Sequence, residues 1–166
     1  MTATTAAFLP EAAQPFFCEG NSTGLLLIHG FMGMPGELRS LGAYLATQGY
    51  TVSGMLVARH GQAPAALYGV RWPEWYASAE AALRQLMLRC ERVVIVGFSM
   101  GGLLALRLAA HYPVAGVVSL AAAFALAGGW PLRTLPVARY VMPWFYPMRN
   151  ANFNDPQVRA SIVEKT

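Results

Sequence analysis

The sequence contains few cysteines, histidines or charged residues. Of its 166 residues only 12% are charged, 3 are histidine and 2 are cysteine. Cys18 and Cys90 show neither metal-ligand spacing nor a redox motif, so we expect no metal and no other cofactor. Two isolated cysteines also fit a protein kept reduced in the cytoplasm, which is the location that we predict.

Basic residues do not cluster, although they outnumber the acidic ones. The formal net charge is +4, from 11 arginines and a single lysine spread between Arg39 and Lys165. A nucleic-acid-binding surface normally shows a basic run or stripe. The sequence therefore predicts no nucleic-acid partner.

The sequence also lacks a targeting signal and a convincing membrane span. Residues 1–14 contain no basic residue and no sustained apolar run, so they do not resemble a signal peptide. The uncharged window 108–132 reaches the length of a membrane helix. It contains His111, Pro113 and Pro131, however, and divides into a helix end, a strand and a loop. We therefore expect no stable membrane insertion.

Apolar residues are abundant, at 55% of the chain with a mean hydropathy of +0.39. They fall into an alternation of short apolar runs and helical patterns without internal repeats, which is typical of a mostly parallel sheet covered by helices on both faces. The sequence thus predicts an α/β fold. The expected strands are 25–29, 50–57, 92–96 and 114–120, and the expected helices are 35–48, one beginning at Trp72, and 100–111.

The segment Gly97-Phe-Ser99-Met-Gly101 has the G-x-S-x-G pattern of a nucleophile elbow. It follows an apolar strand and precedes a helical segment, which is the context that the pattern requires. Glycines two residues before and after the serine fit a strand-to-helix turn that is too tight for side chains. The pattern predicts Ser99 as a nucleophile at a helix N-terminus, where developing negative charge is favoured.

A second glycine-rich segment follows the apolar run 25–28. In His29-Gly30-Phe31-Met-Gly33 the glycines allow the backbone to approach a substrate closely. An acyl-transfer enzyme holds its oxyanion with two backbone N–H groups. We predict that Phe31 in this loop and Met100 after the nucleophile supply them, and that His29 shapes the loop and is not the base.

These motifs resemble those of the α/β-hydrolase superfamily, in particular the small bacterial carboxylesterases and monoacylglycerol lipases of the serine aminopeptidase group. The resemblance runs nearly end to end. It implies an α/β-hydrolase fold, no cofactor, and hydrolysis of carboxylic esters by a Ser-His-Asp triad. The motifs that carry it are Pro15-Phe-Phe17, His29 to Gly33, His60-Gly61, Trp72-Pro-Glu-Trp75 and the elbow at 97–101.

The triad acid and base are absent from this chain. In α/β-hydrolases the acid and then the histidine follow the serine. After Ser99 the only histidine is His111, and no histidine follows Asp155 or Glu164. We interpret His111 as a helix-end residue, His60 as a structural loop residue and Asp155 as a turn residue. The sequence then corresponds to the N-terminal two-thirds of an esterase.

The chain divides into two parts on this interpretation. Residues 1–127 are the N-terminal part of the hydrolase core, and residues 128–166, rich in proline and aromatics, are the start of a lid, with the late core strands absent. Packing of a surface loop is the alternative for the second part. The helical stripe of Trp75, Ala79 and Leu83 is interpreted as core.

Two functional hypotheses follow. The first is a serine hydrolase that cleaves short or medium acyl esters or monoacylglycerols through an acyl-enzyme on Ser99. The alternative is a non-catalytic protein, either a truncated pseudoenzyme or a fragment that binds an apolar ligand or a partner. An unpaired strand at 114–120 would leave an apolar sheet edge, which also predicts possible self-association.

Overall fold

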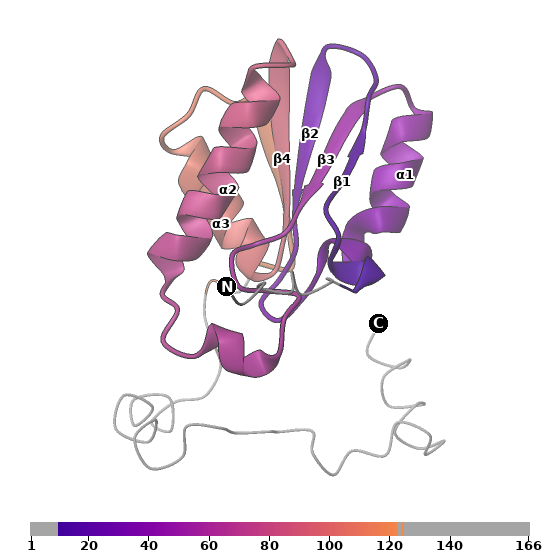
Figure 1. The fold of residues 1–166 in the computed structure, drawn as a ribbon. Helices are drawn as coiled ribbons and strands as arrows, with labels where there is room; N and C mark the ends of the chain where they lie inside the picture. The colour runs from indigo at the N-terminus through magenta and orange to yellow at the C-terminus, as the bar shows by residue number, and fades with distance from the viewer. Residues whose placement is uncertain (1–9, 123, 125–166) are drawn as a thin grey trace, which may run out of the picture. The chain divides into compact units, whose positions relative to one another are not determined.

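The computed structural model describes residues 10–122 and 124 (Figure 1). In this part of the chain five strands form one sheet, in the order β1-β3-β2-β4-β5. Strand β1 pairs antiparallel with β3, and all other neighbouring pairs are parallel. The strands are β1 (Phe16–Cys18), β2 (Thr23–Ile28), β3 (Thr51–Met55), β4 (Arg92–Phe98) and β5 (Gly116–Leu120).

Helices connect the parallel strands and cover both faces of the sheet. Helix α1 (Arg39–Thr47) packs on one face, whereas α2 (Trp72–Met87) and α3 (Met100–Ala109) lie together on the other (Figure 1). Three short 3-10 helices complete the described elements: η1 (Glu11–Ala13), η2 (Pro35–Leu38) and η3 (Pro64–Leu67). The expected alternation of strands and helices is thus present.

The two faces of the sheet carry separate hydrophobic clusters because successive strand side chains point to opposite sides. Leu26 and Ile28 of β2 pack under α2 and α3, and Leu25 and Leu27 pack under α1. All four side chains are buried. This two-sided burial explains why the strands read as continuous apolar runs rather than as alternating ones.

Several boundaries differ from the sequence expectations. The predicted helix 35–48 begins as the 3-10 helix η2, with Pro35 in its first turn, and becomes α-helical only at Arg39. Helix α2 ends at Met87, and Cys90 is buried in the connection between this helix and β4. The predicted lid, residues 128–166, lies outside the described residues.

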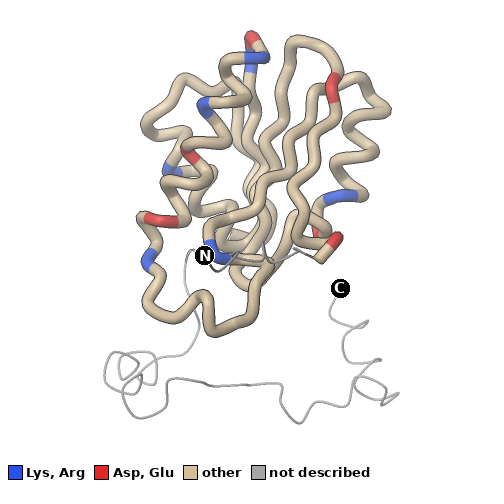
Figure 2. Tube along the Cα trace, viewed as in Figure 1, with Lys and Arg blue, Asp and Glu red and all other residues tan. Residues whose placement is uncertain are grey.

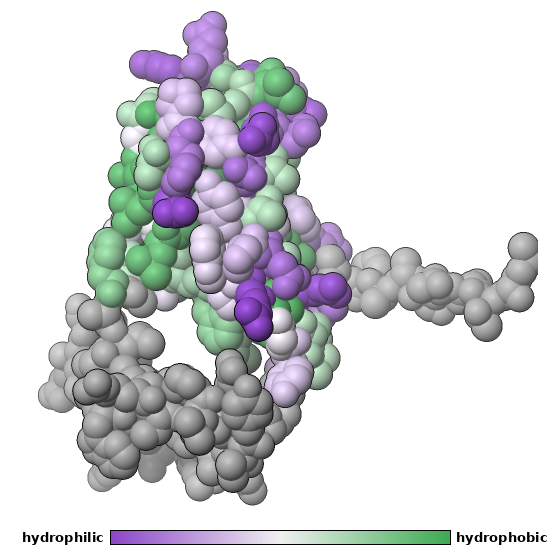
Figure 3. Space-filling model, turned by 90° about the vertical axis from the view of Figure 1, so that its left-hand side faces the viewer, coloured by the Kyte–Doolittle hydropathy of each residue, from purple (hydrophilic) through white to green (hydrophobic). Residues whose placement is uncertain are grey.

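Charged residues are dispersed over the helices and loops of the described chain (Figure 2). Hydrophobic side chains gather along one side of the face shown in Figure 3. Exposed apolar residues occur on α3 and β5, at Leu103, Leu106, Val118 and Leu120. Strand β5 is the outermost described strand on this side of the sheet.

Among the described residues, none of the helices combines the length and apolar character that crossing a bilayer requires.

Close contact between α3 and the sheet depends on two glycines. A Cβ built on Gly97 would collide with the backbone of Gly101, and one built on Gly101 would collide with the carbonyl of Ile28 and lie 2.6 Å from that of His29. The start of α3 therefore lies directly on the end of β2.

We expect Gly101→Ala to lower the free energy of unfolding by about 2–3 kcal/mol, because backbone atoms of β2 must move to admit the methyl group. Gly116→Ala is the matched control, since a Cβ at Gly116 would meet nothing closer than 3.9 Å. Its effect should stay within about 0.5 kcal/mol. Urea denaturation measures both, and equal effects would contradict the packing argument.

Candidate active site

The carboxyl ends of β2 and β4 lie side by side at the point where the chain reverses its direction of progress across the sheet. From β2 the chain moves to β3 on one side, and it then crosses back over β2 to reach β4. Ligand sites in open α/β sheets form at such switch points. The register pairs Ile28 with Gly97, so the loop after β2 and the turn after β4 start next to each other.

Ser99 occupies this turn in a strained conformation. Its φ is 53° and its ψ is −115°, and it directly precedes the first residue of α3. The Ser99 N–H donates to the Leu120 carbonyl at 2.8 Å, and the Ser99 carbonyl accepts from the Gly102 N–H at 3.0 Å. The backbone is thus tied to both β5 and α3, which leaves the half-buried Ser99 side chain at the strand end.

Backbone strain is concentrated at this edge of the sheet. In the described chain the non-glycine residues with positive φ are Met32 (57°), Arg59 (65°), Ser99 (53°) and Ala121 (47°). They follow β2, β3, β4 and β5 respectively. Such conformations cost about 1–3 kcal/mol each and cluster at functional sites.

The glycine-rich loop after β2 lies against the elbow. A Cβ built on Gly30 would lie 3.3 Å from Ser99 Cβ, so the loop contacts the serine directly. The Gly33 N–H donates to the Gly30 carbonyl at 3.1 Å and closes a turn around Phe31 and Met32. Neither the Phe31 nor the Met100 N–H has an acceptor among the described residues. The residues on either side of these contacts, Met100 directly after Ser99 and Phe31 directly after Gly30, thus each carry a backbone N–H that no described residue accepts.

His29 is fully buried and uses both ring nitrogens. Its Nε2 accepts the Val57 N–H at 3.0 Å, so its Nδ1 carries the proton and donates to the Gly30 carbonyl at 2.9 Å. Burial lowers the pKa of His29 to about 4, against the raising effect of the Gly30 bond, and nearby His60 lowers it further. The neutral imidazole links the ends of β2 and β3 and fits the loop-shaping role.

The other two histidines also lack a bond to Ser99. His60 is buried and pairs Nδ1 with the Ala58 carbonyl at 3.0 Å. His111 lies beyond the far end of α3, where it pairs Nδ1 with the Arg107 carbonyl at 2.8 Å. Asp155, interpreted above as a turn residue, lies outside the described residues.

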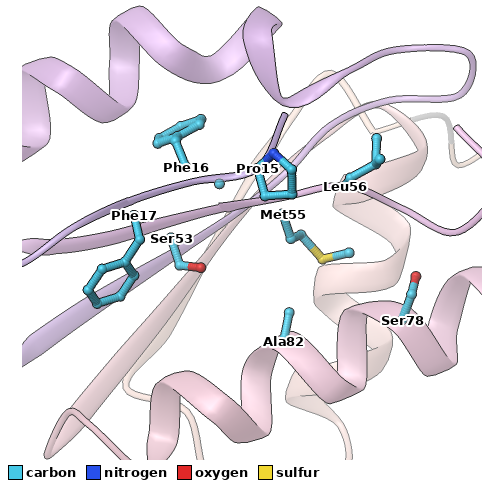
Figure 4. A pocket seen from close by; sticks show the side chains of 9 residues that line it. Pro15, Phe16, Phe17, Ser53, Met55, Leu56, Ser78 and Ala82 are labelled. Atoms are coloured by element: carbon cyan, nitrogen blue, oxygen red, sulfur yellow. The ribbon is translucent and has the colours of Figure 1, made fainter. Parts of the chain in front are cut away.

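A shallow groove of about 380 Å³ lies toward the β1 edge of the sheet, on the face that α2 covers (Figure 4). Its lining comes from β1, β3 and α2 and includes Phe17, Ser53 and Ala82. Strand β2 lies between β3 and β4, so this groove is separated from Ser99 by the width of the central strand.

Comparison with known proteins identifies the family. The model of the family described as serine aminopeptidase, S33, matches residues 19–165. The chain belongs to this family of serine hydrolases. The match covers the elbow, the loop after β2 and every described strand from β2 to β5.

Two curated relatives belong to bacilli. A thermostable monoacylglycerol lipase of a Bacillus species (strain H-257) is 33% identical over 160 residues, which cover 94% of this chain and 62% of the lipase. A carboxylesterase of Bacillus subtilis (strain 168) is 31% identical over 110 residues, which cover 66% of this chain and 45% of that enzyme. The chain thus spans about half to three-fifths of the length of the relatives that it matches.

Solved structures confirm the predicted α/β-hydrolase fold. One of two metagenome-derived lipolytic enzymes superposes with a TM-score of 0.72 and 33% identity, over 77% of this chain and 53% of that one. A monoacylglycerol lipase from Paleococcus ferrophilus shares the fold with a TM-score of 0.62 at 19% identity, over 91% of this chain and 62% of that one.

The structure brings the sequence-selected residues of the elbow and the loop together at one edge. Trp75 packs against the core cluster, as the helical stripe predicts, but its contact with the loop after β2 is not evident from the stripe. Trp75 is only half-buried, and its ring lies 5.6 Å from that of Phe31. Its position in the first turn of a helix that follows a strand was the available signal, because such a turn lies near the carboxyl edge.

We expect Ser99→Gly to raise the free energy of unfolding by about 1 kcal/mol relative to Ser99→Ala. Glycine adopts the Ser99 backbone angles without strain, and this gain of about 1–3 kcal/mol exceeds the entropic cost of glycine. Both variants lose the hydroxyl, so their comparison isolates the backbone. Urea denaturation measures the difference, and an alanine variant as stable as the glycine variant would show that the turn is unstrained.

We also expect stability to fall on mild acidification because of His29. The unfolded imidazole titrates near 6.5 and the folded one near 4, so the unfolded chain binds the extra proton first as the pH falls. Above pH 6.5 the low pKa of His29 contributes a constant ~3 kcal/mol to the free energy of unfolding. This contribution is lost as the pH falls from 6.5 to 4.

Urea denaturation at pH 5 and pH 7.5 measures this loss. His29→Gln is the control, because its amide oxygen can accept the Val57 N–H but does not titrate. The wild type should lose ~2 kcal/mol more than this variant between the two pH values. Identical losses would exclude His29 as the titrating group.

Proposed function

We propose that the protein is a serine ester hydrolase with Ser99 as its nucleophile. The observation that carries the proposal is the position of Ser99 on a strained turn at the start of α3, against Gly30, with the Phe31 and Met100 N–H groups that no described residue accepts close in sequence to these two residues. Strain of this kind is retained where a side chain must be presented to a substrate. The family match and the names of the curated relatives support the same chemistry.

The proposed reaction follows from this arrangement. Ser99 Oγ attacks the ester carbonyl carbon, and the carbonyl π electrons move onto oxygen. The Phe31 and Met100 N–H groups stabilise that oxyanion, helped by the dipole of α3. The Ser99 proton passes to a general base during the attack. The intermediate then expels the alcohol, which takes that proton from the base, and leaves an acyl-enzyme. Water gives a proton to the base as it attacks the acyl carbon, and the base returns this proton to Ser99 Oγ as the acid leaves.

The proton of Ser99 needs a general base. None of the three histidines in the sequence is proposed as this base. The ring nitrogens of His29 are both engaged, His60 is buried, and His111 lies beyond the far end of α3.

We propose carboxylic esters with apolar acyl groups as the substrate class, either short or medium acyl esters or monoacylglycerols. Phe31 and Met32 stand beside the elbow with 54% and 57% of their surface exposed. Exposed apolar side chains at a site favour an apolar acyl chain. One curated relative is named a monoacylglycerol lipase and another a carboxylesterase.

A second candidate is a non-catalytic protein that binds an apolar ligand. The observation that favours it is that no described histidine makes a hydrogen bond to Ser99, as a working triad requires. The two candidates differ in whether Ser99 reacts.

The test compares hydrolysis of p-nitrophenyl butyrate by the wild type and by Ser99→Ala. We expect the variant to lose at least about 100-fold in kcat/KM, since the nucleophile is removed. A fluorophosphonate should also add to Ser99, where Oγ displaces fluoride from phosphorus, and peptide mass spectrometry locates the adduct.

Ser22→Ala is the control, because Ser22 lies just before β2 at the opposite edge of the sheet and bonds Glu91. It should retain the wild-type rate. An unchanged rate in Ser99→Ala would contradict the role of Ser99. A wild type that binds a monoacylglycerol in calorimetry but neither turns over ester nor forms the adduct would favour the second candidate.

A further inference from the structure

Four aromatic rings meet beside the loop that follows β2. We call His29, Phe31, His60 and Trp75 the aromatic cluster. Phe31 is 54% exposed, and its ring centroid lies 6.0 Å from that of His60 and 5.6 Å from that of Trp75. His60 lies 5.1 Å from His29 and 5.9 Å from Trp75, both in edge-on geometry. The cluster joins the loop after β2, the loop after β3 and the first turn of α2.

The turn that carries Phe31 has a strained backbone conformation that its own residues do not favour. It is closed by the Gly33 to Gly30 hydrogen bond, and Met32 stands in its third position with a φ of 57°. That position normally requires glycine or asparagine. A methionine there costs free energy, and such a conformation persists only when surrounding contacts impose it.

The contacts available to impose it are limited. The hydrogen bonds of His29 fix the backbone up to Gly30, and the chain is fixed again at η2, which begins at Pro35. Between these points Met32 is largely exposed. The Glu37 carboxylate lies against Gly33 at the end of the turn. At its middle, the Phe31 ring packs on His60 and Trp75, and among the described residues this is the side-chain contact that holds that part of the turn.

The composition of the cluster is costly for a purely structural role. His60 Nε2 and Trp75 Nε1 are buried and have no hydrogen-bond partner among the described residues. Buried polar atoms without partners cost about 1–3 kcal/mol each in proteins. Apolar side chains would fill the same space without this cost, so stability alone does not account for these two residues.

We propose that His60 and Trp75 are positioning residues, which hold the Phe31 ring and thereby aim the Phe31 N–H at the carbonyl oxygen of the substrate. The inference rests on the proposed function for its catalytic meaning. The structural part, that the two rings hold the turn, is independent of it.

The kinetic test replaces Trp75 with leucine. Loss of the tilted ring contact between Trp75 and Phe31 should misplace the donor without removing it, so kcat should fall about 10- to 100-fold, whereas loss of an oxyanion donor costs 10²- to 10³-fold. KM for p-nitrophenyl butyrate should change less than about threefold, because the donor acts mainly on the transition state. Trp75→Phe keeps an aromatic face and should restore most of kcat.

Trp72→Leu is the matched control. Trp72 lies in the same first turn of α2, but it packs on Tyr76 and Arg107 and not on Phe31. Its substitution should leave kcat and KM unchanged. His60→Leu serves as a second variant, and urea denaturation checks that each protein is folded.

A second readout does not need activity. Amide exchange of Gly33, whose N–H closes the turn, should accelerate at least about tenfold in Trp75→Leu and His60→Leu but not in Trp72→Leu. Unchanged Gly33 exchange in folded variants would overturn the inference. If Gly33 exchanges faster in the two variants but the wild type hydrolyses no ester, the proposed function is wrong and the structural inference is supported. Faster exchange with unchanged kcat would overturn the catalytic meaning alone.

Discussion

The contact between the first turn of α3 and the end of β2 is the constraint on which the rest of the site depends. Gly97 and Gly101 allow backbone to meet backbone there, without side chains between them. Because of this contact, the start of α3 and the loop after β2 share one edge of the sheet. Two N–H groups from distant parts of the sequence, neither accepted by a described residue, can then lie near one serine. Larger side chains at either glycine would separate the two donors.

The strained turns at this edge are supported by the sheet beneath them. Four non-glycine residues adopt positive φ, one after each of β2, β3, β4 and β5. Their combined cost is several kcal/mol. Two buried hydrophobic clusters, one on each face of the sheet, offset it. The stable part of the fold is therefore the centre of the sheet, and the chemistry is placed where the backbone is least relaxed.

Features that depend on local sequence could be predicted, and those that depend on pairing could not. The elbow and the loop after β2 have residue patterns that only a few backbone conformations satisfy, so the sequence could predict that Ser99 and Gly30 lie at the same edge of the sheet. Strand β1 has three residues and no periodicity, and its antiparallel partner, β3, is more than thirty residues away. Helical periodicity predicts that Trp75 packs on the core, which it does, but periodicity does not show that its ring also meets Phe31 of the loop after β2.

The hydrogen bond from the Ser99 N–H to the Leu120 carbonyl has a consequence for the order of synthesis. The elbow is tied to a strand that the ribosome makes about twenty residues later, and domains fold as their chain emerges, starting from the N-terminus. A nascent chain that has reached α3 carries the serine but not the strand that fixes its backbone. The backbone geometry of Ser99, the proposed nucleophile, is therefore completed only when β5 has been made and has paired with β4.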